Sequence, residues 1–103
     1  MIKNFLFSVL ISSSLLIAEV IIDVRTLEEF QSTHLNKAIN IEWQNILSIQ
    51  NNINKTEKIY LYCRSGNRSQ RATEILVNAG FVNVENLGSL QQASETLNLK
   101  IIK

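Results

Sequence analysis

Short apolar segments alternate with segments of helical periodicity along most of the chain. The apolar segments cover residues 19–24, 38–41, 58–62 and 82–84, and β-branched residues are frequent in them. Apolar residues recur at helical spacing over residues 43–50 and 72–79, Thr26 and Glu29 form a capping box, and a last helix is expected over Leu90 to Leu97. "NLGSL" at residues 86–90 is expected to be a loop. Because the connections fit only crossover units, we predict a parallel α/β sheet with helices on both faces.

Composition sets the scale of this fold and the classes of partner. The chain has 103 residues, 46% hydrophobic and 18% charged, which suits one small globular domain. The formal net charge is +1, with both signs spread along the chain. Bulk electrostatics therefore gives no reason to expect a nucleic acid or an anionic membrane as partner.

The N-terminal residues resemble a targeting segment. Lys3 provides a short basic region, and residues 5–17 are 13 uncharged residues, the length of a signal-peptide core and too short to span a bilayer. We predict a signal peptide over residues 1–18, cleavage after Ala18, and a single mature domain over residues 19–103 in the periplasm with no membrane association. The alternative is that residues 5–17 form a buried strand or helix of the core.

The chain has a single cysteine, Cys63, at the end of the third expected strand. A lone cysteine is often a small buried hydrophobe, but the following "RSGNRS" and the helix after it change the interpretation. Arginines and a helix N-terminus lower a thiol pKa, and Gly66 allows backbone amides to converge. We therefore predict a nucleophilic thiolate that reaches solvent. The residues that serve it are expected to be Arg64, Ser65, Gly66, Asn67, Arg68 and Ser69, with Ser69 also a candidate N-cap and Arg71 either part of the cluster or on the outer helix face.

The loop "CRSGNRS" resembles the active-site loop of the rhodanese family. "IIDVRTLEEF", "HLNKAINI" and "VENLGSL" resemble further segments of that family in the same order. The resemblance implies a five-stranded parallel sheet and a sulfurtransferase in which Cys63 carries sulfur as a persulfide. The sulfur would come from thiosulfate or a related small anion and pass to cyanide or a thiol, with no cofactor. The resemblance also implies supporting positions for Asp23, Arg25 and His34.

Two positions differ from the family pattern, and two other activities stay open. Lys37 and Ser89 stand where the family often has glycine, which puts substrate preference in question. A persulfide carrier that serves a protein partner would use the same loop. A cysteine-dependent phosphatase or arsenate reductase is less expected, because the C-x4-R spacing from Cys63 to Arg68 is one residue shorter than the C-x5-R of related phosphatases. One cysteine and one histidine, 29 positions apart, do not make a metal site.

Overall fold

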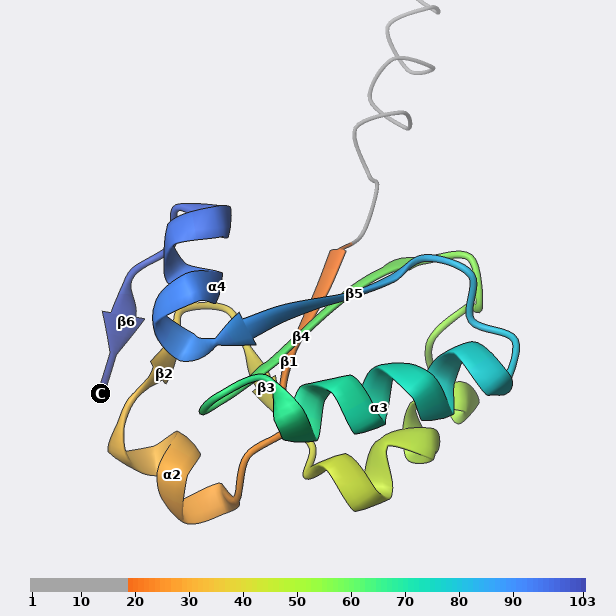
Figure 1. The fold of residues 1–103 in the computed structure, drawn as a ribbon, viewed down its shortest axis with the longest axis horizontal. Coiled ribbons are helices and arrows are strands. Elements are labelled where there is room, and N and C mark those ends of the chain that lie inside the picture. Colours follow the sequence, from red (N-terminus) through yellow and green to blue (C-terminus); the bar gives the residue numbers. More distant parts are fainter. Residues whose placement is uncertain (1–18) are drawn as a thin grey trace, which may run out of the picture.

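The computed structural model describes residues 19–103, which form the alternating strands and helices expected from the sequence (Figure 1). Residues 1–18, which include the predicted signal peptide, lie outside the described part. Within residues 19–103, no helix is long and apolar enough to cross a membrane. The elements in chain order are β1 (Glu19–Asp23), α2 (Leu27–Ser32), β2 (His34–Leu35), β3 (Ile39–Asn40), the 3-10 helix η1 (Trp43–Asn51), β4 (Lys58–Cys63), α3 (Asn67–Asn78), β5 (Val84–Ser89), α4 (Leu90–Leu97) and β6 (Ile101–Ile102).

The main sheet has four parallel strands in the order β3-β1-β4-β5. β2 and β6 form a separate antiparallel pair, in which His34 lies opposite Ile102. The resemblance had implied five parallel strands, and the described residues contain four. The sequence itself predicted four strands before α4. The last apolar residues, Ile101–Ile102, form β6, which pairs antiparallel with β2 and does not add a fifth strand to the main sheet.

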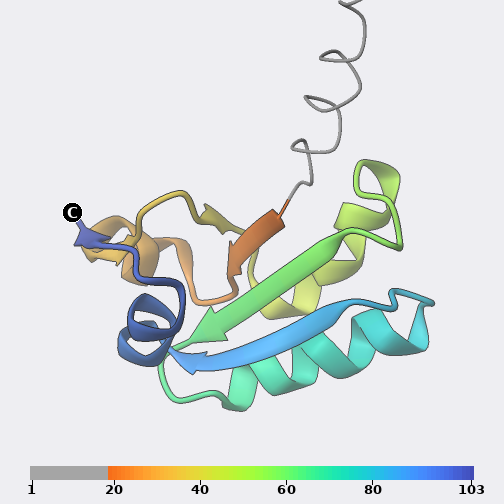
Figure 2. The same ribbon diagram turned by 90° about the horizontal axis from the view of Figure 1, so that it is seen from above.

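Helices cover both faces of the sheet, as predicted. Alternate residues of the central strands point to opposite sides: Ile22 and Leu61 contact one cluster of apolar side chains, and Ile21 and Tyr62 contact the other. The first cluster includes residues of η1 and α3, and the second includes residues of α4 and β2. Figures 1 and 2 show α3 and α4 on opposite sides of the strands. The domain therefore has two cores that share β1 and β4.

Side-chain caps set the start of two helices. The capping box predicted at Thr26 and Glu29 is present, and α2 begins directly after Thr26. Ser89 forms a second capping box with Gln92 and opens α4 at Leu90, where the sequence predicted it. In that position the serine that departs from the family glycine has a clear structural role.

The fourth strand differs from the expectation. It was predicted at residues 82–84 with a loop at residues 86–90, and β5 instead runs over Val84–Ser89. Backbone pairing with β4 holds this polar segment in the sheet: Leu61 lies opposite Asn86 and Cys63 opposite Ser89 across an irregularity in register. A hydrophobic pattern cannot detect a strand that is held by its backbone and carries asparagine and glycine.

Candidate active site

Cys63 is the last residue of β4 and lies at the carboxyl end of the parallel sheet. The loop of residues 64–66 follows it, and α3 begins at Asn67. Asp23 ends β1 and Asn40 ends β3 at the same edge of the sheet. This edge is where parallel α/β sheets bind ligands, because loops and helix N-termini converge there.

The sulfur of Cys63 is surrounded by hydrogen-bond donors from its own loop. The amide of Gly66 donates to Sγ at 3.0 Å, and the amide of Ser69 donates at 3.4 Å. The hydroxyl of Ser69 lies 3.3 Å from Sγ. Gly66 has φ 98°, a left-handed conformation that glycine adopts without strain, and this turns the amides inward as predicted. Gly66 is also the N-cap of α3, so the candidate N-cap role of Ser69 is wrong; Ser69 is the third residue of the helix.

The environment of Cys63 lowers the pKa of its thiol. Burial acts in the opposite direction and raises the pKa, but the Ser69 hydroxyl and the amides of Ser69, Ser65 and Gly66 outweigh it. Cys63 is 0% exposed. The expectation that this thiol reaches solvent is therefore wrong for this conformation, because Cys63 ends a central strand and belongs to the apolar cluster that includes residues of η1 and α3.

The three arginines near Cys63 do not converge on the sulfur. Arg64 is exposed, and Arg71 lies over the ring of Trp43 at 5.5 Å, on the outer face of α3. Arg68 pairs with Glu29 of α2 through bonds of 2.8 and 3.1 Å. That pair lowers the pKa of Glu29 to about 2. Guanidinium charge therefore contributes less to the thiolate than the sequence suggested, and neutral donors contribute more.

Two of the three residues that the resemblance placed as support, Asp23 and Arg25, form a buried polar unit at the end of β1. Arg25 and Asp23 make a bidentate ion pair, with the shortest bond at 2.7 Å between Nη2 and Oδ2. Arg25 also donates to the carbonyl of Thr33 at 2.6 Å. The side chain of Asn40 donates to the carbonyls of Asp23 and Arg25 and so ties β3 to β1. These contacts fix the chain between β1, α2 and β3.

The contacts of His34 are with Phe30 and not with the Cys63 sulfur. Its ring stacks on Phe30 with centroids 3.9 Å apart, and its Nδ1 lies 2.9 Å from the carbonyl of Phe30. This geometry gives His34 a structural position, because its ring joins α2 to β2.

Sequence reasoning missed Asn86 of β5 as a site residue. Its Oδ1 accepts from the Ser69 hydroxyl at 2.6 Å and from the Gly88 amide at 2.9 Å. Its Nδ2 donates to the carbonyl of Gly66 at 3.2 Å. Asn86 stood inside the quoted segment "VENLGSL", but a lone asparagine gives no chemical signal without its neighbours.

Among the loop residues predicted for binding, Ser65 and Asn67 are exposed.

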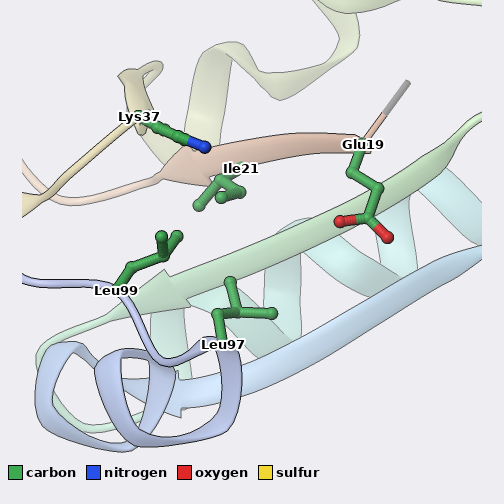
Figure 3. A pocket seen from close by; sticks show the side chains of 5 residues that line it. All are labelled: Glu19, Ile21, Lys37, Leu97 and Leu99. Carbon is green, nitrogen blue, oxygen red and sulfur yellow. The ribbon is translucent and has the colours of Figure 1, made fainter. Parts of the chain in front are cut away.

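A cavity of about 380 Å³ lies away from this loop (Figure 3). It is lined by Ile21, Leu97 and Leu99, with Lys37 and Glu19 at its rim. In the backbone register of β1 and β4, Glu19 lies opposite Lys58, which begins β4, whereas Cys63 ends that strand. Lys37 has φ 76°, so the lysine that replaces the family glycine keeps a left-handed backbone. The departure at Lys37 therefore affects this cavity and not the cysteine loop.

A parallel α/β domain with one cysteine in a donor-lined loop between a strand and a helix has an arrangement that can hold a cysteine thiolate at the carboxyl edge of its sheet. Residues 11–95 match the family described as Rhodanese-like domain. The chain is a member of the rhodanese family, as its motifs predicted.

Relatives agree with this assignment. The chain is 38% identical over 76 residues to "Thiosulfate sulfurtransferase PspE" of Escherichia coli (strain K12), covering 72% of this chain and 73% of that protein. It is 37% identical over 93 residues to "Adenylyltransferase and sulfurtransferase UBA4" of Candida albicans, covering 82% of this chain but only 21% of that protein. The solved structure "rhodanese with anions from E. coli" superposes with a TM-score of 0.73 at 33% identity, covering 84% of this chain and 99% of that one.

Proposed function

We propose that this chain is a thiosulfate sulfurtransferase. The Cys63 thiolate attacks the sulfane sulfur of thiosulfate, a new S–S bond forms, and sulfite leaves with the electron pair of the bond that breaks. Cyanide or a thiolate then attacks the outer sulfur and releases the Cys63 thiolate. The observation that carries the proposal is the set of amide and hydroxyl donors on Sγ, which favours the ionised sulfur.

The residues of the loop have distinct roles in this proposal. Amides of residues 65, 66 and 69 hold the sulfur, and the Arg64 guanidinium, which is exposed, meets the anionic donor. Arg68 fixes the loop to α2 through Glu29. Because Cys63 is buried, loading requires an opening of its surroundings that exposes the sulfur. The supporting positions are Asp23, Arg25 and His34, and the flanking donors are Ser65, Asn67 and Ser69.

The burial of Cys63 also supports a second function, that of a persulfide carrier. A covered sulfur reacts slowly with small molecules and is released when a partner protein opens the loop. UBA4, whose name joins a sulfurtransferase to an adenylyltransferase, is a relative that is far longer than this chain. Saturable turnover with thiosulfate and cyanide supports the enzyme; a stable persulfide that only one protein acceptor discharges supports the carrier.

We also propose that the chain is exported to the periplasm, with residues 1–18 removed as a signal peptide. The basic Lys3 and the apolar residues 5–17 support this proposal. The mass of the protein purified from its own host decides it: a chain beginning at Glu19 supports export with cleavage, and an intact chain beginning at Met1 contradicts cleavage.

Mass spectrometry of the protein after treatment with thiosulfate tests the chemistry. We expect a gain of one sulfur atom on Cys63 that cyanide reverses, and no gain in Cys63→Ser. An Arg71→Ala variant is a matched control, because Arg71 stacks on Trp43 on the outer face of α3. A wild-type chain that never gains sulfur from thiosulfate contradicts the proposed reaction.

A further inference from the structure

Asn86 and Cys63 compete for the one hydrogen bond that the Ser69 hydroxyl can donate. The Ser69 hydroxyl has one hydrogen to donate, and three acceptors lie around its oxygen: Asn86 Oδ1 at 2.6 Å, the Gly66 carbonyl at 3.2 Å and Cys63 Sγ at 3.3 Å. It therefore donates fully to only one of them at a time. The shorter distance favours Asn86, which leaves an oxygen lone pair of Ser69 facing the sulfur.

The neighbours of Asn86 fix the orientation of its amide. The Gly88 amide can only donate, so the atom that it meets at 2.9 Å is the carbonyl oxygen Oδ1. The carbonyl of Gly66 can only accept, so the atom that meets it at 3.2 Å is Nδ2. The acceptor Oδ1 therefore faces Ser69, so Asn86 can accept a hydrogen bond from the Ser69 hydroxyl but cannot donate one to it.

We propose that Asn86 is a positioning residue that holds the Ser69 hydroxyl proton away from Cys63 when the sulfur needs no donor. In the thiol form, the S–H of Cys63 donates to Ser69, and Ser69 donates to Asn86. When Cys63 loses its proton, the Ser69 hydrogen turns to the sulfur and the bond to Asn86 is lost.

The inference rests on the proposed sulfurtransferase function for its consequence in turnover. In a persulfide the negative charge lies on the outer sulfur, so Sγ no longer needs a hydrogen bond from the hydroxyl. Ser69 then donates its hydrogen bond to Asn86 again. Asn86 thus destabilises the free thiolate relative to the persulfide. A less stabilised thiolate is also the stronger nucleophile. Both effects favour transfer of sulfur to the thiolate once it has formed, whereas the higher pKa reduces the fraction of Cys63 that is ionised.

Charged groups around the cysteine do not explain such an effect. On α3, Arg68 is paired with Glu29 of α2, and on β1, Asp23 is paired with Arg25. Arg64 of the loop is exposed. Substitution of Asn86 by alanine touches none of these contacts, so a change in the titration of Cys63 reports on the hydroxyl of Ser69.

Titration of the full chain by thiolate absorbance tests the inference, with the signal of Cys63→Ser subtracted to remove tyrosine. Cys63 is the only cysteine, so the remaining signal has one source. We expect Asn86→Ala to lower the pKa of Cys63 by about one unit or less, the size expected for one redirected neutral hydrogen bond. We expect Ser69→Ala to raise the pKa, and Asn86→Ala to have no further effect when combined with Ser69→Ala.

A matched control separates proton competition from loosening of the loop. Gln70→Ala removes another partner of Asn86, the 3.1 Å contact with Nδ2, and leaves Ser69 in place, so the pKa should not change. If Asn86→Ala raises the pKa or leaves it unchanged, the inference is overturned, because a purely structural role predicts a weaker donor set.

Asn86→Leu keeps the proposal testable if the alanine variant does not fold. Its side chain has a similar branched shape, offers Ser69 no acceptor and adds no charge, so it should also lower the pKa of Cys63; a raised or unchanged value overturns the inference. None of these titrations needs a sulfur donor. A wild-type chain that fails to take sulfur from thiosulfate therefore refutes the proposed function alone, and a wrong sign in the titration refutes the role of Asn86 alone.

Discussion

The sulfur of Cys63 depends mainly on where a few neutral donors point. Two amides and one hydroxyl reach Sγ, whereas one nearby arginine is paired with a glutamate and another stacks on a tryptophan. Hydrogen bonds to the charged form lower a thiol pKa even at a buried position. Reactivity at this site is therefore set by backbone geometry, and a change of backbone should affect it more than the removal of a surface charge.

Alanine at Gly66 tests this dependence on backbone. The φ of 98° costs a non-glycine residue about 1–2 kcal/mol, while the new Cβ would lie 3.5 Å from Gly88 Cα, an ordinary contact. We expect Gly66→Ala to lower the free energy of unfolding by about that amount and to slow the loading of Cys63, because the Gly66 amide donates to Sγ. Chemical denaturation and persulfide formation followed by mass measure the two effects.

Gly80→Ala is the matched control for that variant. Gly80 has φ 100°, and its Cβ would lie 3.4 Å from the flexible Lys55 side chain; Gly80 follows the C-terminal end of α3, whereas the cysteine loop precedes the N-terminal end. A similar loss of stability with a normal loading rate is expected. Equal loss of the loading rate in both variants would show that stability, and not the aim of the Gly66 amide, limits the reaction.

The helices show which elements a sequence can place. A capping box depends only on residues three positions apart, so it can be read from sequence. The box at Thr26 was predicted and α2 begins after it, and α4 begins at Leu90 as predicted, after a capping box at Ser89. β5 carried no such signal, because it is polar and its pairing with β4 depends on residues more than 20 positions earlier. The same reason explains the site: Cys63 and its loop are contiguous and were predicted, whereas Glu29 and Asn86 reach the loop from distant elements.

Glu29 couples α2 to α3, and its titration should appear in the stability of the fold. The Arg68 side chain, together with Thr26, lowers the pKa of Glu29 from 4.5 to about 2, with burial acting against them. Because the folded pKa lies below the unfolded one, the carboxylate stabilises the fold above about pH 4.5, and this stabilisation is lost as the pH falls towards 2. The pair is partly exposed, so its contribution should not exceed about 1 kcal/mol.

Glu29→Gln should therefore be less stable than wild type at neutral pH, and the difference should shrink below about pH 4.5 and vanish near pH 2. Urea denaturation at a series of pH values measures it. Glu85→Gln is the control, since the Lys58–Glu85 pair is more exposed and should contribute little at any of these pH values. A constant difference for Glu29→Gln across the whole range would show that the capping contact to Thr26, and not the charge, is what the variant loses.

At the scale of the whole molecule, the two apolar clusters share the same central strands. Neighbouring residues of β1 illustrate this: Ile22 belongs to the cluster with η1 and α3, and Ile21 belongs to the cluster with α4 and β2. The continuous apolar run of β1 is the direct cause, because successive side chains of a strand point to opposite faces and both faces of this strand are buried. A defect on either face should thus be transmitted through one set of backbone pairings.

The pair Ile21→Val and Ile22→Val tests whether the two faces unfold as one unit. Each variant removes one methylene group, and Ile→Val in a core usually costs about 0.5–1.5 kcal/mol. Ile21 is 8% exposed and lines the cavity, whereas Ile22 is 0% exposed, so the cost should be smaller for Ile21.

Trp43 is the only tryptophan and packs against the cluster of Ile22, so its fluorescence reports on that face. If the domain is cooperative, Ile21→Val must shift the Trp43 transition by as much as it shifts the far-ultraviolet circular dichroism. A shift in circular dichroism without one in fluorescence would mean that the face of α4 unfolds separately from the face that holds Cys63 and α3.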